Sequence, residues 1–177
     1  MLIAAKFYLA TRVFLGAVHA YGNSNEVPYR EQFYVGGSNS VRAFAVRTLG
    51  PGKFHPAYRD RYSYYDQTGT FKFEANTEYR FPILGYFKGA VFLDAGNIWL
   101  LEEDPWRPGG KLKMKNFFDE LALGTGVGLR FDMTMLVVRA DLGIGIHAPY
   151  DTGKSGYYNI PKFKDGLAFH LAIGYPF

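Results

Sequence analysis

The segment Thr70–Phe81, with the sequence TFKFEANTEYRF, decides the fold. Apolar or nearly apolar side chains occupy its odd positions, from Phe71 to Phe81, and charged or amide side chains occupy the even positions between them. Because successive side chains of a β-strand point to opposite faces, this alternation predicts a strand with one apolar face and one polar face.

The same two-residue period recurs along the chain and predicts an all-β protein. Further segments that fit this period, the last two less regularly, are Leu121–Asp132, Met135–His147, Leu167–Phe177, Ala5–Ala17 and Tyr86–Trp99. The pattern predicts about six strands of about 10 to 13 residues each, which is long for a soluble sheet and matches a tilted strand that crosses a membrane.

Long and short connections alternate between the predicted strands. The first, third and fifth connections have about 50, 20 and 18 residues, whereas Pro82–Gly85 and Met133–Thr134 suffice for the others. Outer-membrane barrels alternate short periplasmic turns with long extracellular loops in this way. We therefore expect an antiparallel meander of transmembrane strands with a long extracellular loop at about 21–69 and the C-terminus towards the periplasm.

The composition excludes several other classes of protein. The chain has 177 residues, a formal net charge of +4, 48% apolar residues, 18% aromatic residues and no cysteine. No stretch approaches the roughly 18 consecutive apolar residues of a membrane helix, and the apolar content argues against disorder. Dispersed basic residues give little support to nucleic-acid binding.

The sequence gives no sign of a catalytic or metal site. Without cysteine there is no thiolate nucleophile or thiolate ligand. The four histidines, which are His19, His55, His147 and His170, lack the spacing of metal ligands. No Ser/His/Asp arrangement stands out either, so we expect no enzyme activity, no metal and no cofactor.

The most distinctive loop segment is Tyr29–Phe44, YREQFYVGGSNSVRAF. Gly36 and Gly37 permit a turn with positive φ, and the Ser-Asn-Ser sequence that follows favours turns capped by side chains. This arrangement predicts that Val41 and Arg42 are presented from an ordered loop tip.

That segment resembles the loop-six motif of the BamA-type outer-membrane assembly and translocation family, also called the bacterial surface antigen family. In that family a Val-Arg-Gly-Phe/Tyr tetrapeptide folds back into the barrel lumen. Val41, Arg42, Ala43 and Phe44 fill the four positions here, with Ala43 in place of the usual glycine. The resemblance continues, in the family's order, through Asn76–Pro82, Phe92–Trp99, Gly124–Arg130 and the aromatic last strand.

This resemblance implies that residues 1–177 are the C-terminal part of a sixteen-stranded barrel in the bacterial outer membrane, with the long loop inserted into the lumen. Met1 is then an internal residue of a longer protein, and the family's periplasmic POTRA domains lie outside this chain. The implied partners are outer-membrane lipid, the N-terminal strands and POTRA domains of the parent protein, unfolded β-barrel substrates and accessory lipoproteins.

The implied function is non-enzymatic insertion of β-barrel proteins by lateral strand exchange at a weak seam. The last strand, Gly166–Phe177, forms one side of that seam, with Gly166, Phe169, Tyr175 and Phe177 as its characteristic residues. Glycine and proline near its ends are expected to weaken its pairing.

A guanidinium in a partly desolvated lumen requires anionic partners. Glu78 and Asp94 have the strand parity that faces the lumen, and in the family the matching acids hold the loop arginine. The alternative interpretation is that both are ordinary solvated lumen charges.

Several other interpretations of the chain remain open at this stage. A soluble sandwich or lipocalin-like barrel would use the same alternation. A passive pore or secretion translocator, or the membrane anchor of an exported hydrolase, would use the same barrel. A phosphate-binding loop at Gly124–Gly128 is disfavoured because neither a helix nor a Lys-Ser/Thr pair follows it.

Overall fold

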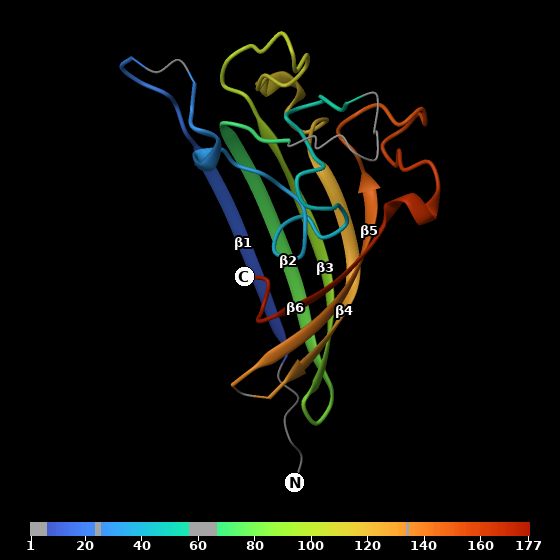
Figure 1. Ribbon diagram of the computed structural model, residues 1–177. Coiled ribbons are helices and arrows are strands. Elements are labelled where there is room, and N and C mark those ends of the chain that lie inside the picture. Colours follow the sequence, from blue (N-terminus) through green and yellow to red (C-terminus); the bar gives the residue numbers. More distant parts are fainter. Residues whose placement is uncertain (1–6, 24–25, 57–66, 134) are drawn as a thin grey trace.

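The computed structural model describes residues 7–23, 26–56, 67–133 and 135–177. Six strands form one antiparallel meander in chain order, which confirms the all-β fold class expected from the alternation (Figure 1). The strands are β1 Tyr8–Ala17, β2 Phe71–Leu84, β3 Phe87–Trp99, β4 Ala122–Asp132, β5 Val137–His147 and β6 Leu167–Ile173. Short 3-10 helices lie at Tyr29–Glu31 (η1), Met114–Asn116 (η2) and Phe163–Gly166 (η3). No helix in these ranges is long and apolar enough to span a membrane.

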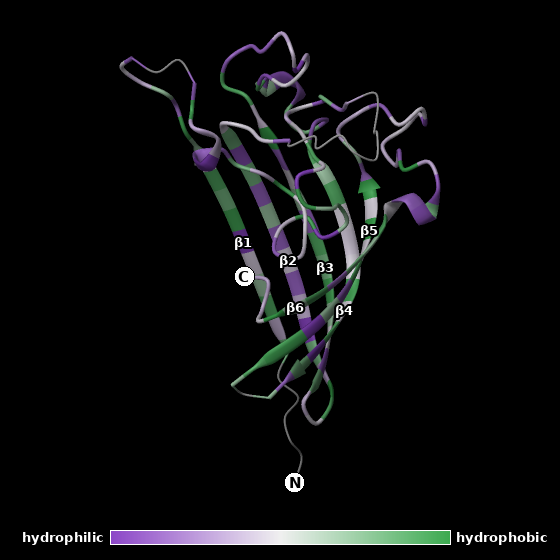
Figure 2. Cartoon of the chain, in the orientation of Figure 1, coloured by the Kyte–Doolittle hydropathy of each residue, from purple (hydrophilic) through white to green (hydrophobic). Residues whose placement is uncertain are grey.

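Polar and apolar side chains separate onto the two faces of the sheet. On β2 the side chains of Glu74, Asn76 and Glu78 are buried on the inner, concave face. On the outer face apolar side chains are exposed, as at Val91 of β3 and Leu171 of β6. Figure 2 shows the resulting bands of hydrophilic and hydrophobic colour along β2. An exposed apolar band around a buried polar interior is the pattern of a strand that faces hydrocarbon.

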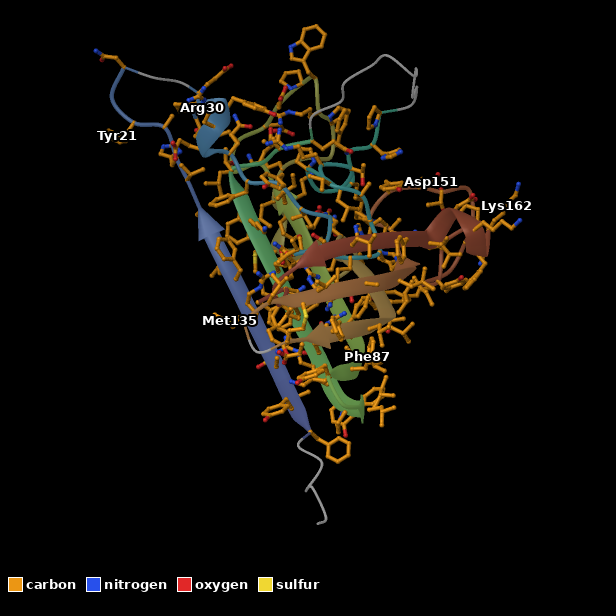
Figure 3. The ribbon with its side chains drawn as sticks, turned by 60° about the horizontal axis from the view of Figure 1, so that its bottom comes forward. Tyr21, Arg30, Phe87, Met135, Asp151 and Lys162 are labelled. Carbon is orange, nitrogen blue, oxygen red and sulfur yellow. The ribbon has the colours of Figure 1, made fainter. Side chains whose placement is uncertain are left out.

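The sheet is strongly curved, and its long connections gather at one end. Figure 3 shows side chains crowded within the curve of the sheet, with Asp151 and Lys162 on the connection that precedes β6. The segments between β1 and β2, β3 and β4, and β5 and β6 meet at the end that we call the loop end (Figure 1). The two short connections lie at the opposite, turn end. The three long connections therefore share one end of the sheet.

Several strand boundaries differ from the sequence-based expectation, most clearly at the end of β2. The predicted turn at Pro82–Gly85 is shorter, because β2 continues through Pro82 to Leu84 across a bulge. A bulge accommodates a residue without a backbone N–H, and only Gly85 takes the positive φ, 55°, that the tight turn needs. Of the turn expected at Met133–Thr134, Thr134 lies outside the described residues, as do Ala5 and Lys6 of the first predicted strand.

The last strand ends at Ile173, so the expectation that it reaches Phe177 was wrong. Gly174 has a φ of 88°, which turns the chain away from the sheet. The Tyr175 hydroxyl then donates to Asp132 at 2.8 Å, and the ring of Tyr175 lies 4.2 Å from the Arg80 guanidinium. These contacts draw the C-terminal residues towards the inner face of β2 in place of continued pairing with β5.

The connection between β1 and β2 folds back against the inner face of the sheet (Figure 1). Its apolar residues Val35, Val41 and Leu49 are fully buried. They belong to a hydrophobic cluster that also contains Ala43, Phe44, Ile98, Ala122, Ala148 and Ile160. This small core fixes the returning loop inside the curve of the sheet, next to the buried polar side chains.

Candidate functional site: the loop clasp

The tip of the returning loop, residues 36–44, is built on two glycines. Gly36 and Gly37 have φ values of 100° and 90°, and a Cβ atom at Gly36 would overlap the carbonyl of Ala45. The Ser40 hydroxyl accepts a hydrogen bond from the Gly36 N–H at 3.0 Å and donates one to Glu74 at 2.8 Å. The tight turn therefore presents the segment that follows it to the inner face of the sheet.

Arg42 lies between the carboxylates of Glu78 on β2 and Asp94 on β3, and its side chain is 0% exposed. Its Nε and Nη2 donate to the two Asp94 oxygens at 2.8 and 2.9 Å, and its backbone N–H donates to the same carboxylate at 3.1 Å. Nη1 pairs with Glu78. The guanidinium also lies 3.5 Å from the ring centroid of Phe92. We call this arrangement the loop clasp.

The loop clasp has the geometry that makes a buried arginine tolerable. Two parallel N–H···O bonds to one carboxylate form the bidentate pair that guanidinium favours. Asp94 lies directly opposite Asn76 in the register of β2 and β3, and the Asn76 amide donates to its Oδ1 at 2.9 Å. Such saturation of the carboxylate is required where charges are removed from water.

A second group of arginines surrounds the loop clasp, and sequence analysis did not single it out. Arg80 and Arg130 donate to Glu78 at 2.7 and 2.9 Å. Arg130 and Arg139 both pair with Asp141, at 2.6 and 2.7 Å. The available signal was their strand parity, which places all of them on the polar face. The Glu78 carboxylate therefore pairs with three guanidiniums, those of Arg42, Arg80 and Arg130, and lies at the centre of the network.

Two arginines also hold the turn before the clasp. Arg139 donates to the Ser38 carbonyl at 2.8 Å and to the Asn39 side chain. From the other side, Arg12 of β1 donates to the Asn39 carbonyl at 2.8 Å and pairs with Glu74. The loop tip is thus tied to strands on both sides of β2 and β3.

Glycines on the inner face make room for the loop tip. A Cβ atom at Gly124 would overlap the methyl group of Ala43, and one at Gly143 would overlap the carbonyl of Arg42. The glycine-rich run from Gly124 lies within β4, where added Cβ atoms would overlap neighbouring atoms. Ala43 does not have a positive φ, so alanine at this position requires no left-handed backbone.

The last strand lies apart from the acids of the clasp. Gly166 is buried against Ile160, and the Phe169 side chain is exposed on the outer face. Phe177 reaches the inner side, where its ring lies 5.2 Å from the Arg12 guanidinium. The structure therefore distributes the predicted seam residues over both faces of the sheet.

We expect neutralisation of Asp94 and of Glu78 to have different effects on the protein. Asp94→Asn should free the loop, since an amide cannot accept both Arg42 N–H groups, and the loop should become cleavable by protease. Glu78→Gln leaves three guanidiniums without their shared charge, so the larger effect should be a lower temperature of barrel unfolding, measured by heat-modifiable gel mobility. Equal loss of loop protection and of thermal stability in both variants would contradict this division.

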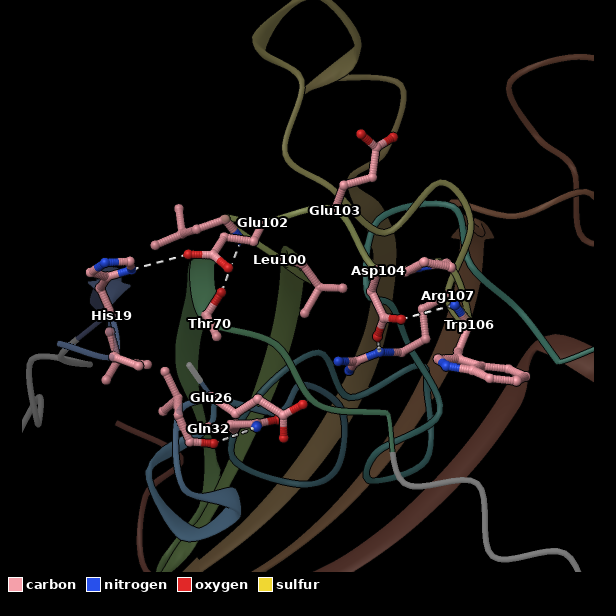
Figure 4. Close-up of a pocket in the computed structure, with 15 residues that line it drawn as sticks. His19, Glu26, Gln32, Thr70, Leu100, Glu102, Glu103, Asp104, Trp106 and Arg107 are labelled. Carbon is pink, nitrogen blue, oxygen red and sulfur yellow. Dashed lines mark hydrogen bonds and ion pairs between the residues drawn. The ribbon is translucent and has the colours of Figure 1, made fainter. Parts of the chain in front are cut away.

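A cavity of about 420 Å³ opens at the loop end and is lined by Glu26, Glu102, Glu103 and Asp104 among others (Figure 4). Arg107 donates to Asp104 at 2.6 Å, and this hydrogen bond lowers the pKa of the Asp104 carboxyl. Across the described ranges, no three His, Asp or Glu side chains are grouped so as to hold a metal ion. The acids here belong to surface loops.

Comparison with known proteins places these observations in a family. Residues 2–177 match the model of the Omp85 superfamily domain. Over 90 residues the chain is 36% identical to the outer membrane protein assembly factor BamA of Neisseria meningitidis serogroup B. This matched stretch covers 48% of this chain and 11% of that protein. Among solved structures, CdiB from Acinetobacter baumannii matches with a TM-score of 0.47 and 18% identity, over 96% of this chain and 27% of CdiB. The chain thus spans a small part of the length of both.

Proposed function

Because this chain belongs to the Omp85 superfamily of outer-membrane proteins, we propose that it is the C-terminal part of a barrel that inserts other β-barrel proteins into the outer membrane. The insertion proceeds by strand exchange at the last strand and involves no covalent chemistry. The barrel is completed by strands that precede Met1, so that neither edge of this sheet faces hydrocarbon unpaired.

The observation that carries this proposal is the short pairing of the last strand. β6 is paired with β5 over seven residues, 167–173, whereas thirteen residue pairs join β2 and β3. Its other edge has no partner among the described strands. A last strand with few hydrogen bonds to its neighbour is suited to exchange its partner for an incoming strand by β-augmentation.

The loop clasp supports the proposal from the lumen side. The returning loop occupies the concave face of the sheet and buries Arg42 there. A passive pore requires this space for solute, so the filled sector favours a barrel whose activity lies at its wall. In this proposal the loop end is extracellular, and the turn end, towards which β6 runs, faces the periplasm.

Partners follow from the same proposal. Unfolded β-barrel chains are the substrates, and POTRA domains and accessory lipoproteins on the periplasmic side deliver them. Membrane lipid contacts the outer face, where Phe169, Leu171 and Ile173 of β6 are exposed.

An engineered disulfide tests strand exchange. This chain has no cysteine, so Ala172→Cys on β6, combined with a cysteine on the facing first strand of the full-length barrel, gives one defined bridge. We expect the oxidised protein to lose insertion of a β-barrel substrate into proteoliposomes, and a reductant to restore it. Ala172→Cys alone is the control and should insert normally.

Unchanged insertion with the bridge formed would refute lateral exchange. If the reduced protein instead secretes a soluble polypeptide and inserts no barrel, the chain belongs to a secretion translocator. If it does neither and a hydrolase domain precedes Met1, it is a membrane anchor.

A further inference from the structure

The side chain of His170, on the last strand, forms a hydrogen bond with the loop tip. The residues of β6 that face the lumen are Ala168, His170 and Ala172, so His170 alone among them is polar. Its Nε2 lies 2.8 Å from the backbone carbonyl oxygen of Arg42, which is 128 residues away in the sequence. A carbonyl oxygen only accepts, so Nε2 carries the proton and His170 donates this hydrogen bond.

Strand β5 is shaped so that this bond can form. Gly143 lies opposite Ala168 in the register of β5 and β6. A Cβ atom at Gly143 would overlap the Arg42 carbonyl, so the carbonyl passes over β5 where that strand has no side chain. Because Gly143 has no side chain, the Arg42 carbonyl can reach His170 on the neighbouring strand, β6.

Residue 42 therefore connects three strands at once. Its side chain and N–H are held by Glu78 of β2 and Asp94 of β3, and its carbonyl is held by His170 of β6. Any displacement of β6 away from the lumen breaks the third connection. Any release of the loop tip removes from β6 its polar contact with the loop.

We propose that His170 is a positioning residue that couples the pairing of β6 to the docking of the loop. The inference rests on the proposed function, in which β6 is the strand that exchanges. When an incoming strand displaces β6, the loop tip loses one of its holds, and a loosened loop in turn makes β6 easier to displace. This reciprocity is required of two events that share one bond.

Backbone hydrogen exchange in the full-length protein, reconstituted without substrate, tests this coupling. His170→Phe keeps a planar ring and removes the donor, and His170→Gln keeps a donor. We expect His170→Phe to speed exchange about fivefold both at 167–173 and at the loop tip, 36–44, which is the factor that one net hydrogen bond corresponds to. His170→Gln should restore most of the protection at both places. Leu171→Val, on the outer face of the same strand, is the matched control and should leave the loop tip unchanged.

A purely structural role for His170 predicts a different result. If His170→Phe speeds exchange on β6 alone, or if His170→Gln behaves like His170→Phe, the coupling is overturned. Arg42→Ala supplies the reciprocal measurement: it should speed exchange on β6 in the wild-type background and add nothing in His170→Phe. Since no substrate is present, failure here leaves strand exchange to be decided by the disulfide.

Discussion

Replacing Arg42 with alanine should release the loop from the lumen while the barrel still forms. The substitution removes the two guanidinium N–H donors from Asp94 and leaves both acids of the clasp without their shared cation. Removing one partner of a buried pair costs about 3 to 5 kcal/mol, less where water enters. The strands should persist because their backbone ladder does not depend on this side chain. The measurement is cleavage within 27–56 by external protease in intact membranes.

Two variants control this experiment. Arg42→Lys should protect the loop only in part, because an ammonium cannot present two parallel donors to Asp94. Arg47→Ala removes a guanidinium from the same loop, one that lies over the Tyr34 ring at 4.6 Å and away from both acids. It should leave the clasp intact. Protection of the loop in Arg42→Ala at the wild-type level would mean that the clasp does not hold it.

The second large effect is expected from Gly143→Ala. A methyl group here would overlap the Arg42 carbonyl and lie 2.9 Å from the Ala43 Cα, so backbone has to move. Overpacking of this kind costs about 1 to 3 kcal/mol. Because alanine is tolerated in a strand, we expect the substitution to destabilise the docked loop and not β5. The measurements are protease cleavage of the loop and the rate of substrate insertion.

Gly145→Ala is the matched comparison on the same face of β5. The nearest heavy atom to its new methyl group is the Ile160 Cδ1, at 3.3 Å, and a side-chain end can yield. We expect the loop to remain protected in this variant. Similar exposure of the loop in both variants would show that any methyl group added to this face of β5 releases the loop. The close approach of the Arg42 carbonyl to Gly143 would then not explain the effect.

The period of two was sufficient to predict the strands and their faces. Alternation in Thr70–Phe81 placed Glu74, Asn76 and Glu78 on one side, and the structure buries all three. The family match decides against a soluble sandwich, a distinction that alternation alone could not make.

The register between the strands and the position of the loop in the lumen could not be predicted from the sequence. Parity placed Glu78 and Asp94 on one face, but Asp94 is opposite Asn76, and Glu78 is opposite Phe92. The period also gave no reason to choose Arg130 or Arg139 over other polar residues of their strands, since their partners lie on the loop and on other strands. The end of β6 was overestimated because Tyr175 and Phe177 continue the alternation, whereas Gly174 turns the chain.

The partners of the loop tip lie far from it in the sequence, and this separation bears on how the barrel folds. The loop tip is synthesised before every strand but β1, yet its partners Asp94, Arg139 and His170 lie further along the chain, with Arg42 and His170 separated by 128 residues. Contacts of such long sequence separation form slowly, because loop-closure entropy has to be overcome first. We therefore expect the docking of the loop to be complete only after β6 has joined the sheet, so that resistance of the loop to protease would distinguish a finished barrel from one still being completed.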